Sequence, residues 1–214
     1  MFERACLLLG MENALVAFLT DPGVMDELVC RIADYKFALL ERFDHAVDLD
    51  MVFYCDDWGG QDRLLISPEL WRRHLKPQTR RIYGALRERG ILINQHSCGR
   101  IEDIFCDLVE MGMDIWNFCQ PCNDLAGLKR EYGERITFQG GIDSQHVLDR
   151  PGVTVAEVRA EVRRRMDELA RGGGYIAGPS HGVPLREDVH AAMNDEIVSY
   201  GRCFYQENRG QTAN

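Results

Sequence analysis

Short apolar runs alternate with longer amphipathic stretches along most of this chain, and that alternation is the feature that most constrains its fold. Short apolar runs that end in glycine or polar residues are typical of buried strands. Five strands are predicted, over residues 49–55, 91–95, 114–118, 135–139 and 175–178. Helices are predicted over residues 1–10, 21–43, 67–89, 101–110, 125–132, 153–170 and 187–200. Strands that alternate with helices form parallel β/α units, so the fold class is α/β, with a barrel or an open sheet as the alternatives.

The helix predicted over residues 67–89 contains residues that indicate where it begins and where it bends. Ser67 is a typical N-cap residue, and Pro68 suits the first helical position because its missing N–H has no partner there in any helix. Pro77 lies inside the same stretch, where a proline removes one hydrogen bond. We therefore expect a kink near Pro77.

Polar side chains follow the predicted strands at the points where the strands end. These residues are Asp56, Asp57, His96, Cys98, Gln120, Asp143, Gln145 and His181. The active sites of barrels and of open α/β sheets lie at this carboxyl edge. The sequence has no Gly-x-Gly-x-x-Gly or Walker-type loop, and the glycines at 172–174 precede a strand, so a nucleotide-binding sheet is disfavoured.

The tripeptide His96-Ser97-Cys98 has the form of half a metal site. Residues two apart on an extended strand point the same way, so the imidazole of His96 and the thiol of Cys98 are expected to converge. Zinc binds such nitrogen and sulfur ligands in a tetrahedron and keeps one position open when the site is catalytic. The alternative is that Cys98 is an inert thiol.

Charge and composition exclude several classes of protein. The net charge is −9, and the arginines are interleaved with acidic residues, which disfavours a nucleic-acid partner. No apolar segment approaches the length of a membrane span, and residues 1–4 do not open a signal peptide, so a cytoplasmic location is expected. The eight cysteines are scattered, and in a reducing compartment most of them are expected to be buried thiols.

Taken together, the motifs resemble the uroporphyrinogen decarboxylase and cobalamin-linked methyltransferase superfamily, over essentially the whole chain. Those after the first and second strands are Asp56-Asp57-Trp58-Gly59, Ser67-Pro68-Glu69-Leu70-Trp71 and His96-Ser97-Cys98-Gly99. The later ones are Gln120-Pro121, LKREYG at 128–133, GGIDSQ at 140–145, GGYI at 173–176 and Pro179-Ser180-His181-Gly182. Each motif is weak alone, but their order is specific.

The resemblance implies a (β/α)₈ TIM barrel with its site at the carboxyl mouth. Such a barrel needs about 250 residues, so we expect residues 1–214 to be one domain of this family that lacks the N-terminal strands: a partial barrel of about five parallel strands with flanking helices. A sheet with open edges invites pairing. A homo-oligomer or an N-terminal segment that completes the barrel is therefore expected.

Two branches of the superfamily compete for the function. In the methyltransferase branch, a His-x-Cys pair and a later Cys hold zinc, which activates a substrate thiol for methyl transfer with a corrinoid such as methylcobalamin. His96 and Cys98 match that pair, and His181 stands at the place of the later Cys. In the decarboxylase branch, that late position is a His that contacts the tetrapyrrole, so the alternative is decarboxylation of uroporphyrinogen in porphyrin biosynthesis.

The resemblance assigns roles residue by residue. We expect Asp57 and His181 to be catalytic, and His96, Cys98 and His181 to hold the metal. Cys119 and Cys122 lie near the same predicted edge of the sheet, and either is an alternative third ligand. Asp56, Gln120, Asp143 and Gln145 are expected to bind a small-molecule substrate. Asp56 and Asp57 also admit a structural interpretation, since Asp commonly bonds nearby backbone in turns.

Three further possibilities belong to the same resemblance. A corrinoid protein is a possible partner. The chain could also be a non-catalytic binding or assembly subunit, or a fragment.

Overall fold

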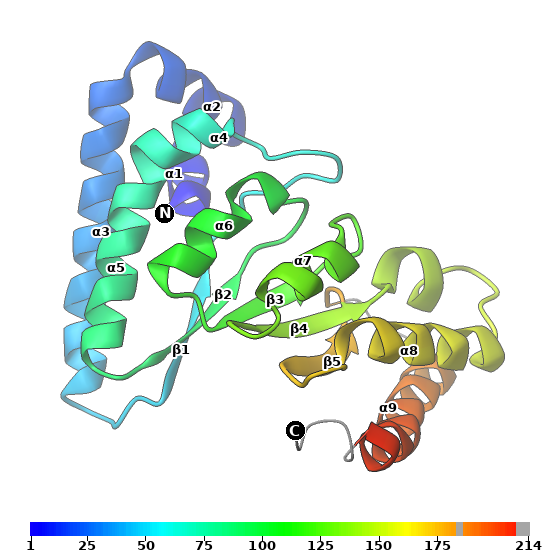
Figure 1. Cartoon of the computed structure of the whole chain (residues 1–214). Helices are drawn as coiled ribbons and strands as arrows, with labels where there is room; N and C mark the ends of the chain where they lie inside the picture. Colours follow the sequence, from blue (N-terminus) through cyan, green and yellow to red (C-terminus); the bar gives the residue numbers. More distant parts are fainter. Residues whose placement is uncertain (183–185, 209–214) are drawn as a thin grey trace. The chain divides into compact units, whose positions relative to one another are not determined.

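The computed structural model describes residues 1–182 and 186–208 (Figure 1). Five parallel strands form a sheet in the order β1-β2-β3-β4-β5, and helices flank them. The strands are β1 (Met51–Cys55), β2 (Leu92–His96), β3 (Ile115–Cys119), β4 (Thr137–Ile142) and β5 (Tyr175–Pro179). This confirms the predicted α/β class and the five parallel strands.

The chain divides into two compact units, Met1–Trp116 and Asn117–Asn214. The single-domain organisation stays a prediction. The first unit holds α1 (Phe2–Leu9), α2 (Met11–Thr20), α3 (Pro22–Asp44), α4 (Pro68–Leu70), the π-helical turn η1 (Trp71–Leu75), α5 (Lys76–Glu88) and α6 (Glu102–Met111). The second unit holds α7 (Leu125–Tyr132), the π-helical turn η2 (Ser144–Leu148), α8 (Val155–Leu169) and α9 (Glu187–Asn208).

In the first unit, helices cover one face of the β1–β2 pair. Figure 1 shows α3 and α5 side by side next to the strands, and their residues are in contact. The ring of Tyr54 in β1 meets Tyr83 of α5 edge to face with centroids 6.0 Å apart, and Lys36 of α3 lies 4.1 Å above the Tyr54 ring. Met51 and Phe53 alternate with Val52 and Tyr54 along β1, so they lie on the opposite face, where they are exposed.

Two unpredicted details of this unit have a local cause. The prediction for residues 67–89 was one helix with a kink at Pro77, whereas the structure has a π-helical turn over Trp71–Leu75 that ends before the proline. Pro77 has no N–H to donate to the carbonyl of Arg73. Just before it, the N–H of Lys76 donates to the Trp71 carbonyl, which is the i to i−5 hydrogen bond of a π-helical turn. Helix α2 was not predicted.

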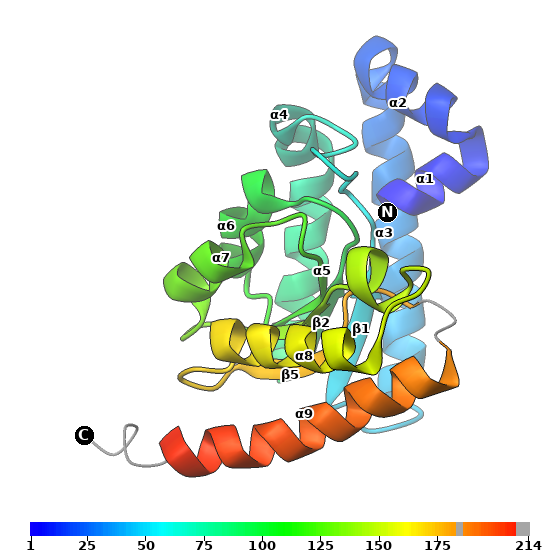
Figure 2. The ribbon, with the colours of Figure 1, turned by 90° about the vertical axis from the view of Figure 1, so that its right-hand side faces the viewer.

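In the second unit, α8 packs against both β4 and α9. Figure 2 shows α8 and α9 side by side, and an apolar cluster that includes Ile142, Val162 and Val189 is buried here. Strand β4 was predicted to end at Gln139 but continues through Gly140 and Gly141, whose φ angles of 109° and 87° only glycine adopts readily. Within residues 1–182 and 186–208, no helix has both the length and the apolarity that a membrane span requires.

Candidate metal site

The ends of β1 and β2 bring two ligand-type side chains together. The two strands are parallel, and their register places Cys55, the last residue of β1, directly beside His96, the last residue of β2. Paired residues on neighbouring strands project on the same face of a sheet, so the thiol and the imidazole lie on one side. This is the face of β1 on which Met51 and Phe53 are exposed.

The loops that follow the two strands are held against each other. A Cβ atom on Gly99 would lie 2.3 Å from the carbonyl carbon of Gly59, and a Cβ on Gly59 would lie 2.6 Å from the Cys98 carbonyl oxygen. Only glycines permit this approach, and Gly99 also has a φ of 77°. The N–H of Arg100 donates to the Gly60 carbonyl at 2.8 Å, and the N–H of Trp58 donates to Ser97 Oγ at 3.1 Å.

Asp57 stands at the centre of this loop contact. Its Oδ1 accepts a hydrogen bond of 2.7 Å from the backbone N–H of Cys98 and lies 3.4 Å from His96 Nε2. The thiol of Cys98 lies 3.5 Å from the same nitrogen. The structure thus brings together three residues that the sequence analysis selected: Asp57, His96 and Cys98.

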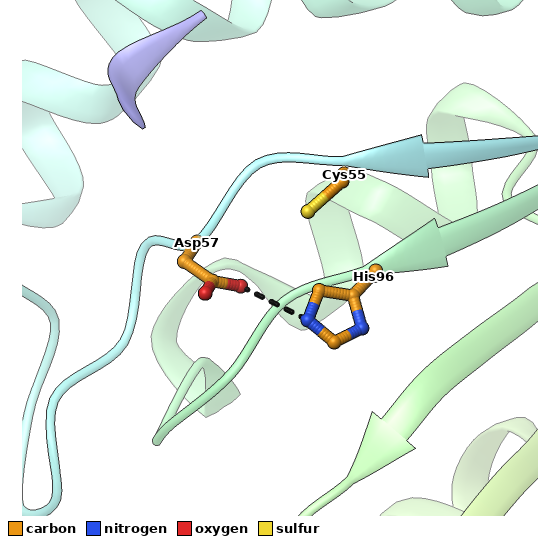
Figure 3. Close-up of side chains that lie close together, drawn as sticks. All are labelled: Cys55, Asp57 and His96. Carbon is orange, nitrogen blue, oxygen red and sulfur yellow. Dashed lines mark ion pairs between the residues drawn. The ribbon is translucent and has the colours of Figure 1, made fainter. Parts of the chain in front are cut away.

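A fourth donor, Cys55, was not selected from the sequence. One ligand atom each from Cys55, Asp57 and His96 lies within 4.8 Å of the others. Figure 3 shows the three side chains close together. Cys55 on β1 is the ladder partner of His96 on β2. That relation depends on strand register, which the sequence does not state, although the position of Cys55 at the end of an apolar run two residues before Asp57 was a usable signal.

The surroundings keep the Cys55 thiol protonated while no cation is bound. Burial, together with the negative charges of Glu3 and Asp57, raises the pKa of Cys55 to about 12, and its thiol donates to Glu3 Oε2 at 3.5 Å. A cation inverts this effect because it favours the thiolate over the thiol. Thiol and imidazole donors suit zinc, and thiols of both Cys55 and Cys98 lie near His96, so the residues present fit the expected metal.

Asp56 points into the protein rather than toward this group. Its carboxylate is fully buried and accepts hydrogen bonds of 3.0 Å from the N–H groups of Phe2 and Glu3 and of 3.1 Å from the indole of Trp58. The amino group of Met1 lies 2.7 Å from the same carboxylate. These contacts match the structural alternative for Asp56, and its binding of substrate stays a prediction.

The other predicted site residues belong to the second unit, where each follows a strand. Gln120 follows β3 and is half-buried, and its carbonyl accepts from the N–H of Asn123 at 3.1 Å. Asp143 caps η2 by accepting from the His146 N–H at 2.9 Å, whereas Gln145 is exposed. The backbone N–H of His181 donates to Ser144 Oγ at 3.3 Å.

The predicted third metal ligands also lie in the second unit. His181 is half-buried, Cys122 is half-buried, and Cys119 is buried, which raises the pKa of its thiol to about 12. A ligand set that joins His96 and Cys98 to any of these three residues therefore combines both units. It stays a prediction.

Comparison with known proteins places these features in a family. The family model described as uroporphyrinogen decarboxylase (URO-D) matches residues 2–194. Uroporphyrinogen decarboxylase from Methylococcus capsulatus is 24% identical over 197 residues, which are 87% of this chain and 51% of that protein. The enzyme of the same name from Syntrophotalea carbinolica is 30% identical over 128 residues, which are 60% of this chain and 34% of that protein. The chain thus spans about half the length of the first of these relatives, and the match to the second is shorter.

A solved structure shares the fold. A methyltransferase from Methanosarcina mazei superposes with a TM-score of 0.73 at 15% identity, covering 92% of this chain and 56% of that one. At this identity the likeness concerns the fold alone. It agrees with the partial barrel expected from the sequence.

Proposed function

The chain belongs to the uroporphyrinogen decarboxylase (URO-D) family, and from that premise we propose that it serves methyl transfer between a corrinoid and a thiol acceptor, with zinc at the ends of β1 and β2. The observation that supports this reaction is the approach of the Cys98 thiol and the Asp57 carboxylate to His96 Nε2, at 3.5 and 3.4 Å. The proposed location is the cytoplasm. The methyl donor is a free corrinoid or one carried by a corrinoid protein.

His96 and Cys98 are the residues that hold the metal in this proposal. Bound zinc lowers the pKa of a thiol that coordinates it, so that the acceptor is a thiolate at neutral pH. A free thiol has a pKa near 8.5 and is only a few per cent ionised at pH 7. The fraction of the acceptor present as thiolate therefore rises more than tenfold, in addition to any effect of positioning.

The chain's own residues orient the ligands. Asp57 fixes the backbone at Cys98 through the 2.7 Å hydrogen bond, and the contact of Gly59 with Gly99 holds the two loops together. The Phe53 ring lies 5.4 Å from the His96 ring, centroid to centroid, and restricts the imidazole from the side of β1. The Asp57 carboxylate is a base that lies 3.4 Å from His96 Nε2, and we assign to it the proton that an incoming thiol releases.

A second candidate is decarboxylation of uroporphyrinogen, and the names of the curated relatives favour it. That reaction would use His181 for contact with the tetrapyrrole and would need no metal. It predicts that His181→Asn reduces turnover more than Cys98→Ser does. The two candidates therefore differ both in their dependence on metal and in the residue that matters most.

The test uses the purified chain with each substrate in turn. Methylcobalamin and a panel of small thiols are supplied, and loss of the cobalt–methyl bond is followed in the cobalamin absorption spectrum. We expect turnover that a zinc chelator stops, and a loss of at least about 100-fold in His96→Ala. His45→Ala is the matched control, because His45 is exposed at the end of α3.

The same preparations are then given uroporphyrinogen, and release of carbon dioxide is measured. Decarboxylation that a chelator does not affect, without methyl transfer, would overturn the proposal in favour of the second candidate. Absence of both reactions would show that this chain does not carry either chemistry by itself.

A further inference from the structure

We infer that Cys55 is a protein ligand of the same metal, so that the site is completed by β1 and β2 without a residue from the second unit. This inference rests on the proposed zinc site and specifies its third ligand. The prediction from sequence placed His181, Cys119 or Cys122 in that role. All three lie beyond residue 116, whereas Cys55 lies within the same compact unit as His96 and Cys98.

Strand register places Cys55 where a ligand is needed. Cys55 and His96 are partners in the parallel ladder, and each is the last residue of its strand. Side chains of such partners extend from one face at the distance between neighbouring strands, about 4.8 Å. The pairing is anchored at both ends of the ladder. The N–H of Asp56 donates to the His96 carbonyl at 3.2 Å, and the N–H of Leu92 donates to the Asp50 carbonyl at 2.9 Å.

The distances at His96 Nε2 match those expected between two ligands of one zinc ion. Two ligands at 2.0 to 2.3 Å from one zinc ion, separated by a tetrahedral angle, lie about 3.3 to 3.8 Å apart. His96 Nε2 is 3.4 Å from Asp57 Oδ1 and 3.5 Å from Cys98 Sγ. Cys55 offers its sulfur within 4.8 Å of ligand atoms of both His96 and Asp57, so His96 is the residue that both cysteines approach.

The chemistry of Cys55 also suits a ligand. Its thiol is directed at carboxylates, since it donates to Glu3 Oε2 and lies in the group with Asp57 (Figure 3). A second thiolate makes the donor set softer, which favours zinc over the hard cations magnesium and calcium. Three protein ligands, His96, Cys98 and Cys55, leave one position of four for a substrate thiol.

Cobalt(II) substitution counts the thiolates directly, without any assay of activity. Cobalt(II) occupies zinc sites, and each coordinated thiolate adds to a charge-transfer band in the near ultraviolet. We expect Cys55→Ser and Cys98→Ser each to retain about half of the parent's band, and the double variant to lose it. Zinc affinity, measured by competition with a chromogenic chelator, should fall at least about tenfold in Cys55→Ser.

Cys106→Ser is the matched control, since Cys106 is an exposed thiol on α6 of the same unit. It should leave the band and the affinity unchanged, and far-ultraviolet circular dichroism of every variant verifies the fold. A parent-like band in Cys55→Ser beside a reduced band in Cys98→Ser would overturn the inference and leave the proposed zinc site standing. A parent that binds neither zinc nor cobalt would overturn both.

Discussion

Asp56 and Asp57 are adjacent in sequence but have opposite surroundings. The carboxylate of Asp56 is fully buried and serves the start of α1 and the indole of Trp58, whereas Asp57 is 30% exposed and faces His96. Because successive residues of an extended segment point to opposite sides, one carboxylate supports the fold and its neighbour is available for chemistry.

This contrast predicts different costs for the same substitution. Asp56→Asn removes a charge from buried donors and leaves at least one of them unpaired, so the free energy of unfolding should fall by about 2 to 3 kcal/mol. Asp57→Asn keeps an oxygen that can accept from the Cys98 N–H and should cost less than about 1 kcal/mol. Urea denaturation followed by tryptophan fluorescence measures both, and equal losses would contradict the assignment of Asp56 to the fold.

Among the elements, α6 is held to η1 and α5 by the carboxylate of Asp107. Asp107 of α6 accepts from Arg72 Nε at 3.0 Å and from the ammonium of Lys76, and its side chain is 9% exposed. Burial by itself raises the pKa of Asp107, but the hydrogen bonds and charges of Lys76 and Arg72 outweigh it and leave the pKa below its ordinary value.

This lowered pKa makes the contribution of Asp107 depend on pH. Since the pKa is lower in the folded than in the unfolded chain, the stabilisation is fully present above the unfolded pKa of about 3.9 and is lost as the pH falls through the folded value. Asp107→Asn should therefore lower the free energy of unfolding by about 1 to 3 kcal/mol at pH 7, and the difference from the parent should shrink below about pH 4. Denaturant titrations across this range are the measurement, with Asp62→Asn, at an exposed loop position, as the control. A difference that is constant with pH would contradict the ion-pair origin.

At the level of elements, local sequence was a good guide to type and a weaker guide to ends. The strands could be predicted because their apolar runs end in polar or glycine residues. The end of β4 was predicted too early because Gly140 and Gly141 continue the strand, whereas glycine pairs usually mark a turn. The sequence predicted a distortion near Pro77 because proline removes a hydrogen bond, but it did not show that the distortion would be a π-helical turn. Likewise, His96 and Cys98 could be recognised as candidate ligands from their spacing in the sequence. Recognising Cys55 required the register of β1 against β2.

At the scale of the whole molecule, the exposed apolar side chains near the start of β1 and β2 set the strongest expectation. Met51 and Leu92 are direct partners in the ladder and are 46% and 48% exposed, and Phe53, two residues after Met51, is 55% exposed. Exposed apolar side chains that lie next to one another mark a surface for association. The curated relative from Methylococcus capsulatus is about twice as long as the part of it that this chain matches, so more chain is present there than here.

We therefore predict that the purified chain associates with itself through this face. Burial of apolar area stabilises such a contact by about 25 cal/mol per Å², and two lysines in place of Met51 and Leu92 would have to be desolvated in it. Met51→Lys with Leu92→Lys should thus shift the chain toward the 24.5 kDa monomer in sedimentation velocity over a concentration series. Leu19→Lys with Val24→Lys adds the same charge at exposed apolar positions of the α2 and α3 region and should leave the association unchanged. A parent that is monomeric at every concentration, or two double variants that behave alike, would show that this face is not the contact.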